Sequence, residues 1–200
     1  MTVALAPALV VYCHPDAASF TARVRDEVVA TLRSQGRTVD LLDLYADGFD
    51  PVFDLADKHA HDEHTVPPGV PTEHAERLRR AGVVVLVYPT WYGGPPAMLK
   101  GWIDRVFTPG VAYHLPPGAS RVRAGLRNVR HIAIVTTHGS SKWVNAVGGE
   151  PGKRMIRRTL RVLCHPLARS HWIALYGMDR AGDAERAAFL TRVGREISRL

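Results

Sequence analysis

The chain has 200 residues, of which 46% are hydrophobic and 22% charged, and its formal net charge is +7 at pH 7. This length fits one domain over residues 1–200, and no apolar run is long enough to span a bilayer, so we expect neither membrane insertion nor a signal peptide. The two cysteines form no CxxC motif, which argues against a disulfide framework or a zinc finger and favours a reducing, cytoplasmic setting.

The first predicted strand, residues 8–13, is a continuous apolar run of the kind that is buried on both faces of a parallel sheet. An amphipathic helix follows over about residues 20–35, with Ser19 as its N-cap. The loop between them leads into a helix N-terminus, where unpaired N–H groups favour an anion. His14, Ser19 and Thr21 could add side-chain donors to a phosphate. A plain capped helix is the alternative, because the loop is neither a Walker A motif nor G-x-G-x-x-G.

The next segment predicts a strand near a sheet edge over residues 38–44, followed by a long irregular stretch over residues 45–71. Histidines and acidic residues crowd residues 59–64, which invites a metal interpretation. Their spacing matches no zinc motif, and the stretch is rich in glycine and proline. We therefore interpret it as a solvated, partly helical excursion, predict no metal, and place a short helix over residues 73–80.

The central segment begins with a strand of buried type over residues 83–88, which a proline ends. The loop 89–95 is rich in chain breakers, and residues 97–107 have helical spacing. Such a loop lies at the carboxyl edge of a parallel sheet, where open α/β folds bind ligands. Trp91 and Tyr92 stand beside glycines that let the backbone approach a flat ligand closely. Alternatively, they plug the sheet edge or form a subunit contact.

The second half of the chain opens with a structured insertion over residues 108–128, in which Tyr113 and His114 could approach the ligand or a partner subunit. A fourth strand over residues 129–137 ends in two hydroxyls and leads into a long loop. The remaining elements are a helix over residues 151–164, a strand over residues 170–176 and a closing amphipathic helix over residues 183–200.

Much of the positive charge lies in two segments, residues 121–130 and residues 153–161. Nucleic-acid binding is one interpretation, but no helix-turn-helix, RRM or KH signature accompanies the charge. A solvated helix face, or a field that attracts anionic small molecules such as dinucleotides, is the more common meaning of such arginines. We therefore expect no nucleic-acid partner.

Alternation of five predicted strands with helices indicates an α/β fold, a doubly wound parallel sheet with helices on both faces. In the strand order 2-1-3-4-5, the first and third strands flank the switch point where ligands bind. The loops 14–19, 89–95 and 136–149 are then expected to converge. A phosphate on the first loop and a flat ring against the other two is the natural geometry for a flavin nucleotide.

Four motifs along the chain occur in the order found in a known family. They are His14-Pro15 with Ser19-Phe20, Asp43-Leu44-Tyr45 with Phe49-Asp50-Pro51, residues 88–93 with residues 96–106, and Thr136-Thr137 with Gly139. On these motifs the chain resembles, from about residue 9 to about residue 176, the flavodoxin-like NAD(P)H:quinone oxidoreductases. That family includes quinone reductases, drug-activity modulators and ancillary subunits of potassium-efflux systems. Thr21 stands where the family has an asparagine.

The resemblance implies a flavodoxin-like fold and a bound flavin, FAD or FMN, near the interface of a homodimer. It also implies that NADH or NADPH gives a hydride to the flavin and that a quinone or similar small electron acceptor then takes its place. A flavin-binding regulatory subunit of a partner such as a potassium-efflux transporter is the alternative. The implied cofactor-binding residues are His14, Ser19, Phe20 and Thr21 for the phosphate or pyrophosphate, and Pro89, Thr90, Trp91, Tyr92, Thr136, Thr137 and Gly139 for the ring.

His138 marks a departure from the family, whose better-known quinone reductases have a glycine at that position and a tyrosine and a histidine further along the loop. Here the matching region is residues 142–145, which offers no such pair. We predict His138 as the catalytic substitute, because the ordinary pKa of histidine suits proton transfer near neutral pH. A loop histidine that faces solvent is the alternative.

Overall fold

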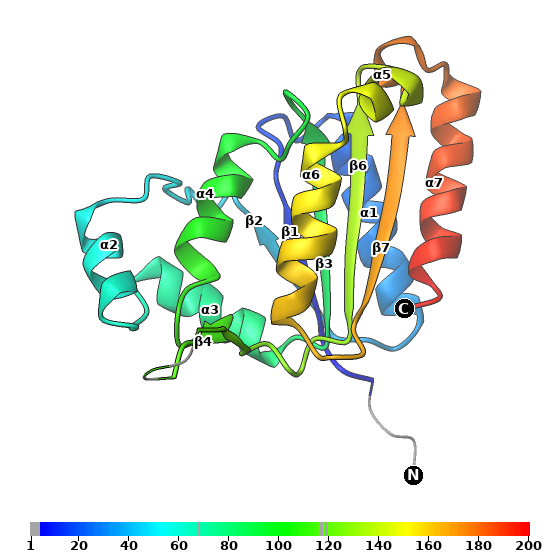
Figure 1. The fold of residues 1–200 in the computed structure, drawn as a ribbon. Helices are drawn as coiled ribbons and strands as arrows, with labels where there is room; N and C mark the ends of the chain where they lie inside the picture. Colours follow the sequence, from blue (N-terminus) through cyan, green and yellow to red (C-terminus); the bar gives the residue numbers. More distant parts are fainter. Residues whose placement is uncertain (1–4, 68, 117, 119) are drawn as a thin grey trace.

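Five parallel strands form the central sheet, in the order β2-β1-β3-β6-β7 (Figure 1). The computed structural model describes residues 5–67, 69–116, 118 and 120–200, so the first four residues of the predicted domain lie outside the described part. Numbered among themselves, the five strands have the order 2-1-3-4-5, which confirms the predicted doubly wound fold. Their bounds are Ala8–Tyr12 (β1), Val39–Asp43 (β2), Val83–Thr90 (β3), His131–His138 (β6) and Arg169–Tyr176 (β7).

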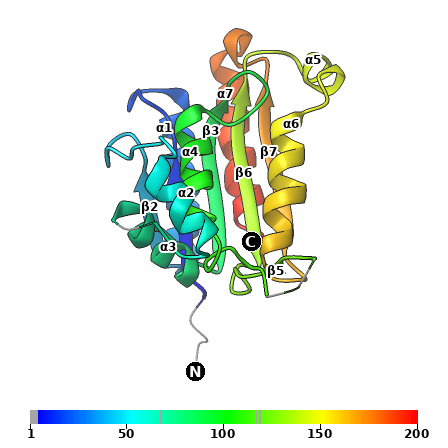
Figure 2. The same ribbon diagram turned by 60° about the vertical axis from the view of Figure 1, so that its left-hand side comes forward.

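Helices cover both faces of this sheet, and a short antiparallel pair lies beyond the amino ends of the strands (Figures 1 and 2). The pair consists of Tyr113–His114 (β4) and Arg123–Ala124 (β5). The longer helices are Phe20–Ser34 (α1), Leu55–Asp62 (α2), Val70–Arg80 (α3), Ala97–Val106 (α4) and Asp183–Ile197 (α7). The shorter ones are Lys142–Val147 (α5), Pro151–Arg154 (α6), Met155–Leu160 (η1, a π-helix), Arg161–Leu163 (η2) and Met178–Arg180 (η3).

Two hydrophobic clusters lie on opposite faces of the sheet. Alternate residues of a strand point to opposite faces, so Leu9 and Val11 of β1 belong to one cluster and Val10 and Tyr12 to the other. Helices α3 and α4, with η1 and η2, cover the first face, and α1 and α7 cover the second. The buried strands therefore read as continuous apolar runs, as parallel strands covered on both sides do.

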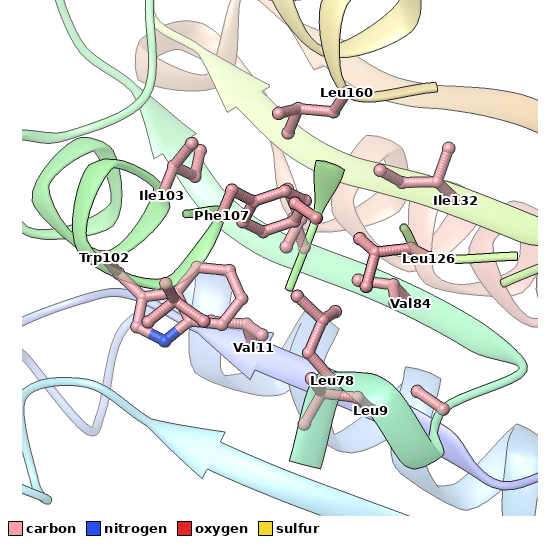
Figure 3. Packing of buried hydrophobic residues seen from close by; sticks show 14 of the residues in the cluster. Leu9, Val11, Leu78, Val84, Trp102, Ile103, Phe107, Leu126, Ile132 and Leu160 are labelled. Carbon is pink, nitrogen blue, oxygen red and sulfur yellow. The ribbon is translucent and has the colours of Figure 1, made fainter. Parts of the chain in front are cut away.

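Trp102 of α4 anchors the first cluster (Figure 3). It is fully buried, and its ring meets Phe107 edge to face at a centroid distance of 5.6 Å. Its Nε1–H donates to Nδ1 of His74, 3.2 Å away. Burial lowers the pKa of His74, so the neutral ring keeps the lone pair that this bond requires. The one polar atom of the largest core side chain is thereby satisfied.

Strand β3 runs two residues further than the sequence predicts, because Pro89 does not end it. Cys13 N–H donates to Val87 O, so Val87 faces β1 with its polar backbone groups. Pro89, two residues later, faces the same side, but β1 has already ended at Tyr12. The missing N–H of proline therefore costs no ladder bond, and Pro89 and Thr90 stay in register with Thr137 and His138 of β6.

Tyr113 and His114 of the predicted insertion do not lie beside the ligand-binding edge, which was one of the two expectations for them. Tyr113 and His114 form β4, which lies near the amino ends of the strands, away from the ligand-binding edge (Figure 1). The Tyr113 hydroxyl is 2.9 Å from Nε2 of His61, a residue of α2. The histidine-rich stretch is thus partly helical, as predicted, and it contacts the insertion.

Gly101 of α4 provides a stability test. A Cβ at this position would come within 2.2 Å of the Pro51 backbone oxygen. We expect Gly101→Ala to lower the free energy of unfolding by about 1–3 kcal/mol, although alanine is the better helix former. Gly194→Ala in α7 is the control, since its Cβ would meet the movable end of the Glu27 side chain. Equal stabilities of the two variants in urea unfolding would contradict the packing argument.

Candidate active site

A cleft of about 520 Å³ lies at the carboxyl edge of the sheet, where β1, β3 and β6 end. It contains ten of the twelve predicted site residues. The missing two, Thr136 and His138, lie in the layer beneath. The residues that line this cleft are His14, Ser19, Phe20, Thr21, Pro89, Thr90, Trp91, Tyr92, Thr137, Gly139, Ser140, Met178 and Asp179.

The first wall of the cleft is the loop that leads into α1. Ser19 is the N-cap of α1, and its Oγ accepts from Ala22 N–H at 3.2 Å. The loop is held by its own bonds, since Asp16 N–H donates to His14 Nδ1 at 3.0 Å and Ala18 N–H to the Asp16 carboxylate at 2.8 Å. The first-turn N–H groups of a helix have no intrahelical acceptor and carry the positive end of the helix dipole. This wall can therefore hold an anion.

The second wall is a tight turn from Trp91 to Gly94. Each of these two residues donates its N–H to the carbonyl of the other, at 3.0 Å. Both residues between them have positive φ, 49° at Tyr92 and 79° at Gly93, as in a type I′ turn. Tyr92 accepts a conformation that favours glycine and projects fully into solvent. Trp91 is 43% exposed, and its ring lies 6.3 Å from that of His14 on the first wall.

The layer beneath the cleft contains a chain of hydrogen bonds that reaches it through Thr90. Thr90 Oγ1 lies 2.9 Å from Thr136 Oγ1 and 3.4 Å from His138 Nε2. On the other side of the ring, His138 Nδ1 lies 2.8 Å from Asn145 Oδ1. Thr136 and His138 are only 1% and 4% exposed, so Thr90 is the member of the chain that faces the cleft.

The donors in this chain follow from the Asn145 side chain. Its Nδ2 donates to the carbonyls of Ser140 and Ser141, which leaves Oδ1 as the acceptor toward His138. His138 Nδ1 then carries the ring proton, and Nε2 accepts from the Thr90 hydroxyl. Thr90, whose own proton is directed away from the cleft, presents an oxygen lone pair to whatever occupies it. If His138 were protonated, Nε2 would donate to Thr90 instead, and the Thr90 hydroxyl would be released to donate to Thr136 or into the cleft.

The surroundings of His138 keep its ring neutral. Burial lowers the pKa of His138, and the Asn145 hydrogen bond and the charge of Glu150 oppose this effect only in part, while Lys153 adds to it. The ring stacks on Tyr176 at a centroid distance of 4.5 Å and lies 6.0 Å from Trp172. His138 is therefore not a solvent-facing loop histidine. It touches the cleft only through Thr90, so the geometry fits positioning of that hydroxyl better than direct proton transfer to a ligand.

Three lining residues were missed by the sequence analysis. Ser140 was part of a predicted loop without a role, whereas Met178 and Asp179 follow β7, whose loop was not considered. A Cβ on Gly139 would come within 2.5 Å of the Asp179 carboxylate, so the glycine makes room for this side chain. An acidic residue three positions after the end of a predicted strand was the signal available in the sequence. Asp179 adds a hydrogen-bond acceptor to the side of the cleft that Gly139, Ser140 and Met178 also line.

A cluster of metal-ligating side chains would indicate a metal site, and a long apolar helix would indicate a membrane protein. Among the described residues, no group of three or more His, Cys, Asp or Glu side chains is arranged to hold a metal ion. No helix in the described ranges has the length and apolar character needed to cross a bilayer. Cys13 and Cys164 are free and buried, and burial raises the pKa of each thiol to about 12.

Comparisons with known proteins agree with this geometry. NAD(P)H dehydrogenase [quinone] 1 of Cavia porcellus is 29% identical over 162 residues, which cover 72% of this chain but 58% of that protein. The chain thus spans less than two thirds of the length of the curated relatives it matches first. The Streptococcus mutans protein Smu.1420 has a solved structure that matches with a TM-score of 0.84 at 27% identity, over 97% of this chain and all (100%) of that one.

A third similar protein, an FMN-dependent NADH-azoreductase of Bacillus anthracis, was solved in complex with FMN. It shares the fold at 16% identity, with a TM-score of 0.73 over 98% of this chain and 99% of that one. The family described as having a flavodoxin-like fold matches residues 7–189, nearly the whole chain. The protein therefore belongs to the flavodoxin-like fold family.

Proposed function

We propose that the protein is a flavin-dependent oxidoreductase that transfers a hydride from NADH or NADPH to a quinone or a similar small electron acceptor. The observation that carries this proposal is the cleft itself, which is lined both by residues at the N-terminus of α1 and by Trp91, Tyr92 and Gly139. The first feature suits a phosphate and the second a flat ring. The names of the Cavia porcellus and Bacillus anthracis proteins support the same chemistry.

The residues of the cleft fit FAD or FMN. The N-terminus of α1, with Ser19 and Thr21, would hold the phosphate, and His14 lies on the same wall. Trp91, Tyr92 and Gly139 would line the ring, and the lone pair of Thr90 would accept a hydrogen bond from an N–H group on its edge. A bound flavin supplies the hydride-accepting and hydride-donating chemistry. The protein contributes the binding, the orientation and the direction of the Thr90 hydroxyl.

The proposal is tested by the visible absorption spectrum of the purified protein, with and without added FAD or FMN, before and after anaerobic addition of NADPH. We expect flavin bands that bleach with NADPH and return when a quinone is added. If no flavin binds, the proposal fails. If flavin binds but turnover with NADH, NADPH and quinones is negligible, the protein is a flavin-binding regulator instead.

We further infer a homodimer, in a reducing cytoplasmic setting. Exposed apolar side chains gather on the loops at the carboxyl edge of the sheet, where Tyr92 is fully exposed and Trp143 and Val147 of α5 are 74% and 70% exposed. A second copy would cover them and enclose the cleft. Light scattering on the purified protein at micromolar concentration should give twice the mass of the chain; the mass of one chain would refute the dimer.

A further inference from the structure

Two cavities outside the flavin-type cleft lie along β7, the edge strand of the sheet. They have volumes of about 510 Å³ and about 490 Å³, and both are lined by Lys153 and Arg157. We refer to them together as the β7 groove. The groove shares no lining residue with the cleft, so its occupancy is a separate question from flavin binding. Its walls come from α5, from α6 with η1 and η2, from β7 and from α7.

The β7 groove is strongly cationic. Its two lining carboxylates already have partners, since Glu150 binds Lys153 and the Tyr176 hydroxyl, and Glu196 pairs with Arg195 and Arg199. Within the described residues, the lining cations other than Lys153 make no ion pair within 4.0 Å. The cations that line the groove are Lys142, Lys153, Arg154, Arg157, Arg158, Arg161 and Arg192.

The backbone concentrates this charge on one side. Arg154 is followed three, four and seven residues later by Arg157, Arg158 and Arg161, and all four line the same cavity. The helix widens there into the π-helix η1, in which Arg161 N–H donates to Ile156 O five residues earlier. Like charges at this spacing destabilise a helix, and π-helical turns occur frequently at functional sites. Arg154, Arg157 and Arg158 are exposed and line the second cavity, so the basic face of this helix forms one wall of the groove.

The edge of β7 does not suit the addition of a further strand. Arg192 donates to the Ala174 carbonyl, and Arg161 donates to the Ala168 carbonyl at 3.1 Å. These guanidinium groups occupy carbonyls that an added strand would need. Each guanidinium has further N–H donors, whose planar arrangement matches phosphate oxygens. The geometry thus favours a compact anion over an extended peptide.

We propose that the β7 groove binds an oligophosphate, either free or as the phosphate chain of a nucleotide. Arg154, Arg157 and Arg158 bind the phosphates, and Lys142 and Arg192 extend the positive field along β7. Trp172 lies in the wall and offers an aromatic surface to a nucleoside attached to the chain. Each cavity has the volume of a small-molecule site. Nucleic acid is the competing occupant, but no nucleic-acid-binding motif accompanies the charge.

The test is isothermal titration calorimetry on the full-length protein in the presence of saturating FMN, with inorganic tripolyphosphate as the probe. The test variant is Arg154→Gln/Arg157→Gln. The control variant, Arg33→Gln/Arg80→Gln, removes the same charge from exposed positions on α1 and α3. We expect the test variant to bind about tenfold more weakly or worse, because charge-assisted bonds to phosphate are lost, and the control to bind within about twofold of the wild type.

Each outcome decides the question. No binding of tripolyphosphate to the wild type, or equal weakening in both variants, would overturn the site. Binding of ATP at least as tight as that of tripolyphosphate, with the same loss in the test variant, supports a nucleotide as the source of the phosphates. A single-stranded oligonucleotide that binds about tenfold more tightly than either and competes with them would replace the oligophosphate with nucleic acid. If FMN does not bind the cleft, the difference between the test and control variants still reports on the groove, because neither variant changes a residue of the cleft.

Discussion

Ser19→Asp should reduce flavin affinity by about a hundredfold or more, because the new carboxylate would lie within a few ångströms of the bound phosphate. Ser19 caps α1 through its side-chain oxygen, which accepts from Ala22 N–H. Aspartate is an equally good N-cap, so the helix and the thermal stability should be preserved. The loss would therefore report on charge at the anion site. Flavin affinity is measured by fluorescence titration of the apoprotein with FMN and FAD.

Ser19→Asn is the matched control for this substitution. Asparagine also caps helices well and has nearly the same shape as aspartate, but it carries no charge. We expect its flavin affinity to stay within about fivefold of the wild type. A similar loss in both variants would mean that the shape of the residue matters and its charge does not. Unchanged flavin binding by Ser19→Asp would remove the phosphate from this loop.

His138→Phe is the second substitution with a large expected effect, a slowing of quinone reduction by about tenfold. Phenylalanine can keep the stack on Tyr176, but it cannot accept a hydrogen bond from Thr90. The Thr90 hydroxyl would then be free to turn its proton into the cleft. Flavin reduction by NADPH and flavin reoxidation by quinone are measured separately by anaerobic stopped-flow spectroscopy. We expect the second rate to fall more than the first.

A double-mutant cycle with Thr90→Val separates positioning from direct proton transfer. If His138 acts only through Thr90, the variant His138→Phe/Thr90→Val should be no slower than Thr90→Val alone. Multiplied effects of the two substitutions would show that His138 also acts independently of Thr90. Valine has the shape of threonine without its hydroxyl, so the packing around the cleft should persist.

The pH dependence follows from the lowered pKa of His138. Its value in the folded protein lies below the ordinary 6.5, so the neutral ring and the Thr90 lone pair should persist at and above pH 6.5. As the pH falls below 6.5, His138 is protonated in the unfolded chain before it is protonated in the folded protein. The free energy of unfolding therefore decreases, and the decrease is complete once His138 of the folded protein is also protonated. The melting temperature of the wild type should therefore fall further between neutral and acidic pH than that of His138→Phe, which lacks this titrating group.

The fold was predictable because its signals are local. The apolar runs at β1, β3 and β6 can be read in the sequence one strand at a time, and the loops after them place most of the cleft. Pro89 was misjudged because the tolerance of a strand for proline depends on where its neighbour ends. The register of β1 against β3 decides this, and it is a property of the folded sheet.

The remainder of the site depends on contacts between distant segments. Helix α5 is only six residues long and has no buried residue, so it lacks the periodic pattern that predicts a helix. The role of Asn145 follows from its position against His138, seven residues earlier, across a turn that the sequence does not specify. Asp179 enters the cleft because β7 pairs with β6 and ends at the same edge.

The order of the strands also has a consequence for the path by which the chain folds. β3 pairs with β1, where Val83 is opposite Ala8, and with β6, where Val83 is opposite His131, so its pairings close long loops on both sides. Such non-local pairing is slow to form, because loop-closure entropy is lost before the contacts are gained. The cleft draws on residues from His14 to Asp179 and exists only after these pairings are complete. A ligand of the cleft should therefore slow unfolding and leave the rate of folding unchanged.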